Sequence, residues 1–222
     1  MKLRNAYLFL ILLSLLSCSG EENKYVFPSV KLEFVNVQTD SKGNIISLTT
    51  DKDSVYQIET DRTKSKLEAD ISTRVICYYE PSTSTISGSY AKADIWSLSK
   101  VVSPTPGKLA SGTQMKTDPV GIQSIWLSGR YINLTLQIKL QSATHSFNFI
   151  EEGIYYQGGK PQVHLILYHD NKGDVEAYTR IGYFSTPLEK YISRFPNGFS
   201  VRYSVNTYTE GIKDYLFSYP GR

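Results

Sequence analysis

The stretch YINLTLQIKL, residues 131–140, alternates apolar and polar side chains without interruption. Its apolar members are Ile132, Leu134, Leu136, Ile138 and Leu140. A period of two is typical of a β-strand that buries one face and exposes the other to water. We therefore predict a strand over residues 131–141, with Asn133 and its polar neighbours on the solvent face.

The same period continues through most of the chain. Before residue 103 it predicts strands over residues 30–38, 45–50, 54–60, 73–80 and 86–98. After residue 118 it predicts strands over residues 121–128, 131–141, 144–150, 163–169, 174–184, 199–208 and 213–219. Clusters of glycine, asparagine, aspartate and proline separate these runs, as expected for hairpin turns. Only residues 188–195 suggest a short helix, so the predicted fold class is all-β.

A segment rich in proline, glycine and serine divides the strands into two groups and is predicted to be an exposed linker, residues 104–117. The five short strands before it fit a small OB-like barrel, residues 28–103. The seven strands after it fit a β-sandwich, residues 118–222. The sequence therefore predicts a two-domain organisation.

The N-terminus carries the pattern of an export signal. Lys2 and Arg4 precede an apolar run that is shorter than the roughly 20 residues of a membrane span, which predicts a signal peptide over residues 1–17. LLSC, residues 15–18, resembles a bacterial lipobox, in which the cysteine becomes the lipid-modified N-terminus. Cys18 is then a stable membrane anchor, because several acyl chains are attached to it. The alternative is an ordinary secretory signal with an unrelated cysteine.

The residues after the lipobox cysteine are small or acidic: Ser19, Gly20, Glu21 and Glu22. This arrangement resembles the surface-export signal of Bacteroidetes lipoproteins and predicts a lipid-anchored protein on the outer membrane, exposed at the cell surface. The alternative is a flexible polar tether over residues 18–27, with the protein facing the periplasm.

Charge and composition exclude some partners. The precursor carries a net charge of +3, and removal of Lys2 and Arg4 leaves 22 basic against 21 acidic side chains. Residues 24–110, which hold the barrel, contain 11 basic and 10 acidic side chains. A near-neutral barrel argues against nucleic-acid binding, which needs a basic groove.

No catalytic or metal-binding pattern is evident, and no cofactor is predicted. Cys77 lies in an apolar run and is expected to be a buried, inert thiol. His164 and His169 are five residues apart on one predicted strand, so their side chains face opposite sides of the sheet. The two histidines therefore cannot bind the same metal ion. The acidic pairs, residues 51/53 and 151/152, are expected in turns.

Aromatic side chains are the remaining candidates for binding. Adjacent aromatic residues on a strand point to opposite faces, so one ring of each pair is expected to be exposed: Tyr78 or Tyr79, and Tyr155 or Tyr156. Trp96 and Trp126 are flanked by isoleucine and leucine and are expected to pack in the core.

Several motifs resemble those of the NigD-like lipoproteins of Bacteroidetes. Leu67 and the run TRVICYY, residues 73–79, resemble the family pattern L…G-x-R-V-x-V-x-Y, and ADIWSL, residues 93–98, is similar to its barrel-closing strand. DPVGIQSIWLSGRYINL, residues 118–134, resembles the pattern D-P-I…W-x-G-G-x-Y-L-N. The chain departs from the family at Ser128, and at Ser72 and Thr73, where glycine is common. His145 and the strand near residue 163 follow in the family order.

The resemblance implies an OB-like barrel followed by a β-sandwich and transfers no catalytic residue. It also implies an immunity role inferred from a bacteriocin locus. We therefore expect a non-enzymatic protein that binds an unknown protein partner. A glycan-binding accessory lipoprotein is the alternative, based on the tyrosines, and an envelope hydrolase based on Glu151, Glu152 and the histidines is a third.

Protease shaving of intact cells tests the N-terminal predictions. We expect the native chain to be shaved, the Cys18→Ala variant to leave the membrane fraction, and the Glu21→Ala/Glu22→Ala variant to be protected inside the cell. Shaving is measured by loss of full-length protein, with a periplasmic protein as the integrity control. Protection of every lipidated form would mean that the acidic pair is only a tether.

Overall fold

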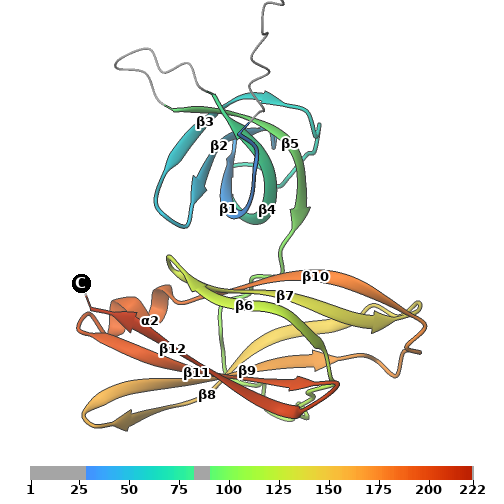
Figure 1. The fold of residues 1–222 in the computed structure, drawn as a ribbon, viewed down its shortest axis with the longest axis vertical. Helices are drawn as coiled ribbons and strands as arrows, with labels where there is room; N and C mark the ends of the chain where they lie inside the picture. The colour runs from blue at the N-terminus through green and yellow to red at the C-terminus, as the bar shows by residue number, and fades with distance from the viewer. Residues whose placement is uncertain (1–28, 83–90, 222) are drawn as a thin grey trace, which may run out of the picture.

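The computed structural model describes residues 29–82 and 91–221 of the chain. These residues form two bodies, an N-terminal barrel and a C-terminal sandwich, stacked one on the other (Figure 1). The predicted signal peptide, Cys18 and the small and acidic residues that follow it lie outside the described residues. Their lipidation and sorting roles stay predictions.

The N-terminal body is a closed five-stranded barrel with the order β1-β2-β3-β5-β4. Its strands are β1 (Lys31–Thr39), β2 (Ile45–Thr50), β3 (Val55–Asp61), β4 (Ser72–Pro81) and β5 (Lys92–Lys100). Only β3 and β5 pair in parallel, and the other neighbours are antiparallel. The five-stranded barrel matches the OB-like prediction. The predicted start of β5 at residue 86 lies outside the described residues.

Alternation along the barrel strands explains its core. Val35 and Val37 of β1, and Val75 and Cys77 of β4, point inward and are fully buried. Burial raises the pKa of the Cys77 thiol to about 12, as expected for an unreactive cysteine in an apolar interior.

The C-terminal body is a sandwich of two sheets, β10-β7-β6 and β12-β11-β9-β8. Its strands are β6 (Gly121–Ser128), β7 (Tyr131–Leu140), β8 (Ser146–Gln157), β9 (Lys160–Asp170), β10 (Tyr178–Pro187), β11 (Gly198–Thr207) and β12 (Gly211–Pro220). The core lies between the sheets, where Leu134 and Leu136 of β7 meet Leu165 of β9 and Val201 of β11. The predicted fold class, a barrel followed by a β-sandwich, is confirmed.

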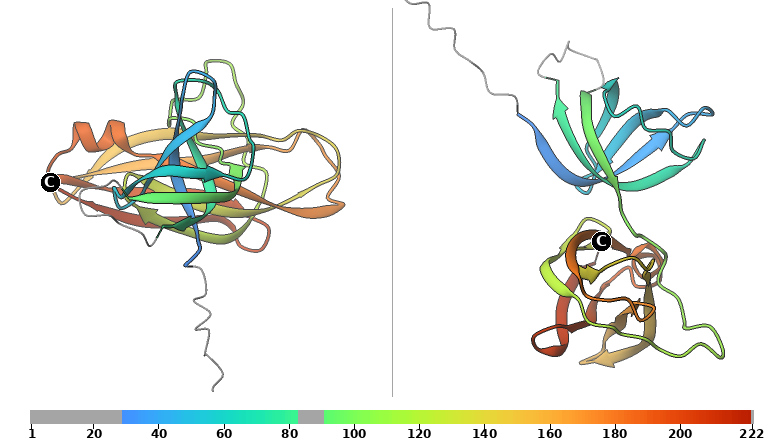
Figure 2. Two further views of the ribbon diagram at one scale, coloured as in Figure 1. Left: turned by 90° about the horizontal axis from the view of Figure 1, so that it is seen from above. Right: turned by 90° about the vertical axis from the view of Figure 1, so that its right-hand side faces the viewer.

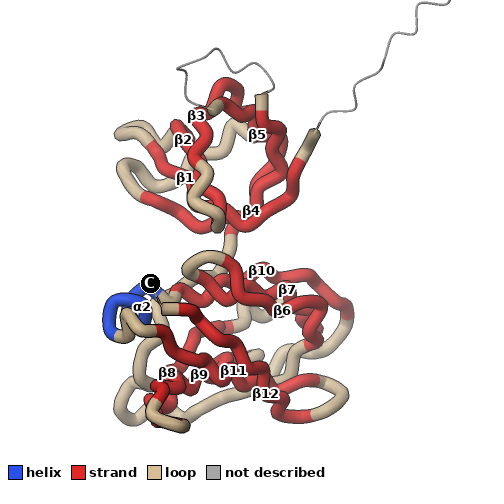
Figure 3. Tube along the Cα trace, turned by 60° about the vertical axis from the view of Figure 1, so that its left-hand side comes forward, coloured by secondary structure: helices blue, strands red, loops and turns tan. Residues whose placement is uncertain are grey.

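A short helix of 6 residues, α2 (Glu189–Arg194), follows β10 at one end of the sandwich (Figure 3). It lies within the predicted helical range and buries Tyr191 and Ile192. Strand β8 is longer than predicted because Glu151 and Glu152, expected in a turn, are inside the strand. A bulge between Glu151 and Gly153 accommodates the acidic pair there.

The segment between the domains is bound to the sandwich and does not stand free. It joins β5 to β6, as the composition predicts, but it contacts four strands on its way: Val102 bridges to β10, Gly107 to β8, Thr117 to β9 and Val120 to β11. Figure 2 shows this green segment running along the side of the sandwich. Residues 110–114 are exposed, as expected of a linker, whereas Val102, Gly107 and Thr117 form backbone bridges to strands of the sandwich.

No helix among the described residues is long and apolar enough to cross a membrane.

Candidate functional site

The two domains meet where one outer face of the barrel lies on the sheet β10-β7-β6. In β4, Val75 and Cys77 point into the barrel core, so Arg74 and Ile76 point outward to the sandwich. In β1, Phe34 is paired opposite Ile76 and faces the same way. All three outward side chains are buried, because the sandwich covers them.

Arg74 is the centre of a buried polar network that joins the domains. Its Nη1 lies 2.7 Å from Asp51 Oδ1, and its Nη2 donates to Asp51 Oδ2 at 2.9 Å. Nη2 also donates to Asn133 Oδ1 at 3.0 Å, and Nε donates to Ser185 Oγ at 3.1 Å. Asp51 belongs to the barrel, whereas Asn133 and Ser185 belong to β7 and β10, so one guanidinium binds both domains.

The partners of Arg74 also bind one another. Asn133 Nδ2 donates to Asp51 Oδ2 at 3.0 Å, and the Ser185 hydroxyl donates to Asn133 Oδ1. The guanidinium carbon lies 3.9 Å from the centre of the Tyr131 ring, a stacking distance. Side chains of Arg74 and Asp51 are only 4% and 9% exposed, so the ion pair is held away from water.

The predicted solvent face of β7 is partly covered by the barrel, which corrects the expectation for Asn133. This residue is fully buried, and Thr135 is nearly so. Glycine at position 129 permits the close approach: its φ is 53°, and a Cβ there would collide with the carbonyl oxygen of Asp51. The period of two was correct, but it does not say whether water or another domain covers the polar face.

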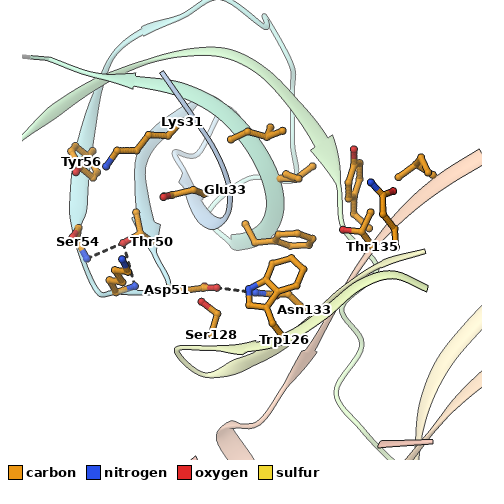
Figure 4. A pocket seen from close by; sticks show the side chains of 17 residues that line it. Lys31, Glu33, Thr50, Asp51, Ser54, Tyr56, Trp126, Ser128, Asn133 and Thr135 are labelled. Carbon is orange, nitrogen blue, oxygen red and sulfur yellow. Dashed lines mark hydrogen bonds between the residues drawn. The ribbon is translucent and has the colours of Figure 1, made fainter. Parts of the chain in front are cut away.

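An open groove of about 500 Å³ lies beside this network, between the barrel and the sandwich. Figure 4 shows Lys31, Glu33 and Tyr56 on its barrel side and Trp126 and Asn133 on its sandwich side. We call it the interdomain groove, and its remaining lining residues are Leu32, Phe34, Thr50, Asp51, Lys52, Ser54, Ile76, Gln123, Ser128, Thr135, Ile181 and Tyr183.

The inner wall of the interdomain groove is aromatic. Phe34 meets Trp126 and Tyr183 edge-on, with ring centroids 5.5 and 6.0 Å apart. Leu32, which is 62% exposed, extends this apolar wall to the surface. An apolar wall with polar groups around it is the usual composition of a binding site.

The two tyrosine pairs that were predicted as binding residues differ in their exposure to solvent. Tyr78 is partly exposed and Tyr79 is buried, as expected for one ring out and one ring in. Tyr155 and Tyr156 are both exposed, since the end of β8 extends past the sandwich core. They lie on the far sheet and do not contribute to the interdomain groove.

The expectation that both tryptophans are core residues was wrong. Trp126 is 36% exposed, because its strand turns this position toward the groove while Ile125 and Leu127 pack on the sandwich core. Trp96 is 42% exposed on the barrel surface, where Arg62 lies 4.3 Å above its ring. Apolar neighbours in sequence therefore did not indicate burial at either position.

The acidic pair of β8 does not form one site with the histidines. Glu151 accepts the Tyr191 hydroxyl at 2.8 Å and pairs with Lys190 at 2.7 Å, which anchors α2 to the sandwich. Glu152 lies 3.4 Å from His164 instead. Among the described residues no group of three or more histidine, cysteine or carboxylate side chains could hold a metal ion.

The other two histidines form a buried chain at the opposite end of β8 and β9. His145 Nδ1 lies 2.9 Å from His169 Nε2, and His169 Nδ1 donates to the Asp118 carbonyl at 2.8 Å. Burial lowers the pKa of His169, so its ring is neutral near pH 7. His145 Nε2 faces the Asp174 carboxylate. Hydrogen bonds from backbone N–H groups, with that of Gln141 the strongest, lower the pKa of Asp174 to about 2.

These features define a class: a two-domain all-β protein with an OB-like barrel, a C-terminal sandwich and a groove between them. Residues 102–219 match the family model described as the NigD-like C-terminal beta sandwich domain. No curated protein gives a significant match to the sequence.

Solved structures agree with the family model. A NigD-like immunity protein from Bacteroides caccae is 32% identical, with a TM-score of 0.70 over 87% of this chain and 99% of that chain. A protein of unknown function from Bacteroides vulgatus is 20% identical, with a TM-score of 0.69 over 86% and 92% of the two chains. A candidate lipoprotein from Bacteroides fragilis shares the fold at 12% identity, with a TM-score of 0.56 over 88% and 99%. The chain belongs to the NigD-like family.

Sequence reasoning missed the Arg74 network that joins the domains, which we call the joint, although two of its residues belong to the motifs that carry the resemblance. Arg74 comes from the barrel motif, and Asn133 comes from the central motif. A lone arginine on the outer face of a strand and an asparagine beside an apolar run were the available signals. Nothing in the spacing of 59 residues indicates that the two side chains bind each other.

We predict that Arg74→Ala lowers the free energy of unfolding by about 3–5 kcal/mol, because it leaves Asp51 buried without its partner. The measurement is urea unfolding followed by tryptophan fluorescence. Arg62→Ala, which breaks an exposed pair with Asp94, is the matched control and should cost less than about 1 kcal/mol. Equal losses for the two variants would contradict a buried joint.

We predict that stability falls as the pH drops below about 6.5, because the unfolded chain then protonates a histidine that the folded chain keeps neutral. His169 has its pKa lowered in the folded state, so its contribution is complete above the unfolded value and is lost as the pH falls toward the folded one. Urea unfolding at pH 8, 7, 6 and 5 measures the slope. His169→Gln should flatten it, and an unchanged slope would assign the effect elsewhere.

Proposed function

We propose that this chain is a membrane-anchored immunity-type protein that acts by binding a protein toxin and not by catalysis. The interdomain groove carries the proposal: it has an aromatic wall with an exposed leucine, and its shape is held by the Arg74 network. A partner side chain that fills such a groove gains affinity without requiring the domains to rearrange.

The family supports the same reading. The B. caccae relative is described as an immunity protein, and it is similar over nearly the whole of both chains. The resemblance implies no catalytic residue, and Asp51, which lines the groove, is already paired with Arg74.

Anchoring belongs to the proposal as well. Cys18 would carry the lipid, and the acidic residues after it would direct the protein to the outer surface of the outer membrane. The candidate lipoprotein from B. fragilis with the same fold is consistent with an anchored protein of this class. At the cell surface, the groove would meet a toxin before the toxin reaches its target.

Expression in a toxin-sensitive sibling strain tests the proposal. We expect the native chain to raise survival in bacteriocin-containing culture supernatants, and we expect Cys18→Ala to abolish the protection. Trp126→Ala, which removes part of the groove wall, should weaken protection, whereas Trp96→Ala on the barrel surface should not. Unchanged sensitivity of the strain carrying the native chain would reject the immunity role.

A glycan-binding role is the second candidate, favoured by the exposed tyrosines at the end of β8. Tyr156 is 66% exposed, and the Tyr155 ring lies 4.4 Å from the His164 ring. Exposed aromatic faces can stack on sugar rings. A glycan array with the native chain and Tyr156→Ala separates this role from toxin binding, because the tyrosines are remote from the interdomain groove.

A further inference from the structure

Strand β10 is an edge strand, and its outer edge is only partly covered. β10 pairs with β7 on one side and ends the sheet on the other. At one point the connecting segment completes the edge: the Val102 N–H donates to the Tyr183 carbonyl at 2.9 Å, and the Ser185 N–H donates to the Val102 carbonyl at 3.0 Å. Val102 therefore acts as a very short added strand.

The same edge continues without a partner beyond Val102. In an antiparallel ladder, alternate residues direct both backbone groups to the same side. Because Tyr183 and Ser185 face the outer edge, Ile181 and Thr179 face it as well. Among the described residues, no strand or loop bonds to this part of the edge.

Hollows lie on both faces of this open edge. On one face, Ile181 and Tyr183 form the end of the interdomain groove. On the other face, a second hollow of about 730 Å³, which we call the side cavity, is lined by apolar side chains that include Ile138, Leu140, Phe147 and Phe184. Both hollows share Ile181 and Tyr183, so a strand added here would direct alternate side chains into one and then the other.

Two cationic side chains also line the side cavity. Lys100 and Arg180 line it, and neither forms an ion pair within the described part of the chain. None of the residues that line the side cavity is a carboxylate, and the neighbouring Asp174 is engaged by the backbone N–H groups of Gln141 and Ser142 and by His145. A segment with acidic side chains would therefore be attracted to this edge, and a basic one would be repelled.

We propose that the open edge of β10 accepts an extended acidic segment of a protein partner as an added β-strand, with apolar side chains of that segment in the side cavity. The inference rests on the proposed function, in which the partner is a protein. Main-chain bonds to Thr179 and Ile181 supply affinity, and the two hollows and the cations select the sequence.

Exposed charges can also protect an edge strand from pairing, and the experiment separates the two roles of Lys100 and Arg180. The probe is a synthetic peptide that alternates glutamate with valine or leucine, titrated into the purified full chain. The comparison probe has lysine in place of each glutamate. We expect the acidic peptide to bind and the lysine peptide to bind at least about tenfold more weakly.

Three variants keep the test specific. Lys100→Glu/Arg180→Glu should reverse the preference for the two peptides. Ile181→Pro removes an outward N–H without removing a bond to β7, so it should weaken binding while the fold is retained. Lys42→Glu/Lys160→Glu reverses two exposed charges away from β10 and is the matched control, which should leave binding unchanged.

Main-chain pairing has its own signature. N-methylation of alternate peptide residues should abolish binding in one register and spare it in the other, and binding should slow hydrogen exchange at Thr179 and Ile181. No binding by the native chain, or equal loss with both methylated sets, would overturn strand addition. Toxin protection that persists in the Lys100→Glu/Arg180→Glu strain would also overturn strand addition, and it would leave the proposed function intact. Peptide binding by the native chain without any protection of the strain would instead reject the immunity role alone.

Discussion

The buried guanidinium of Arg74 is the constraint on which the arrangement of the two domains depends. A charge removed from water is tolerated when it is paired with an opposite charge and hydrogen-bonded by its neighbours. Asp51 supplies the opposite charge from the barrel, and Asn133 and Ser185 supply acceptors from the sandwich. Rotation of one domain against the other would keep the Arg74–Asp51 pair, which lies within the barrel, but would separate it from Asn133 and Ser185 of the sandwich. The interdomain groove is therefore a fixed feature and not a passing gap between two tethered bodies.

The connecting segment has a second structural role, because it completes sheet edges that would otherwise be open. Gly107 bonds to β8 through its N–H and its carbonyl, and Val102 does the same on β10. Open edges invite pairing with other chains, and covering them makes these stretches unavailable for such pairing. The coverage is incomplete at Ile181, and this is where apolar hollows and unpaired cations gather.

Much of the fold could be predicted from the sequence, because local rules decide it. The alternation in residues 131–140 reports which side chains of β7 enter the sandwich core, and the glycine and asparagine turns report where strands end. The site could not be predicted in the same way. Asn133 looked solvated because alternation assigns a face and cannot say what covers it. Trp126 looked buried because its neighbours are apolar, although those neighbours point to the other side of the strand. Glu151 and Glu152 looked like a turn because a bulge inside a strand has no clear sequence signal.

The positions of the motif residues also explain why resemblance to the family predicts the fold but does not predict which partner is bound. Arg74 and Asn133 are occupied by each other and by Asp51, so they cannot contact a ligand without breaking the joint. Specificity must then come from side chains that are free around the joint, such as Leu32 and Trp126 in the groove and Arg180 at the β10 edge. These positions lie on exposed faces, where a change of side chain has a small effect on stability. One scaffold with a fixed joint can therefore present different binding surfaces, and the identity of the partner must be determined from those surfaces and not from the motifs.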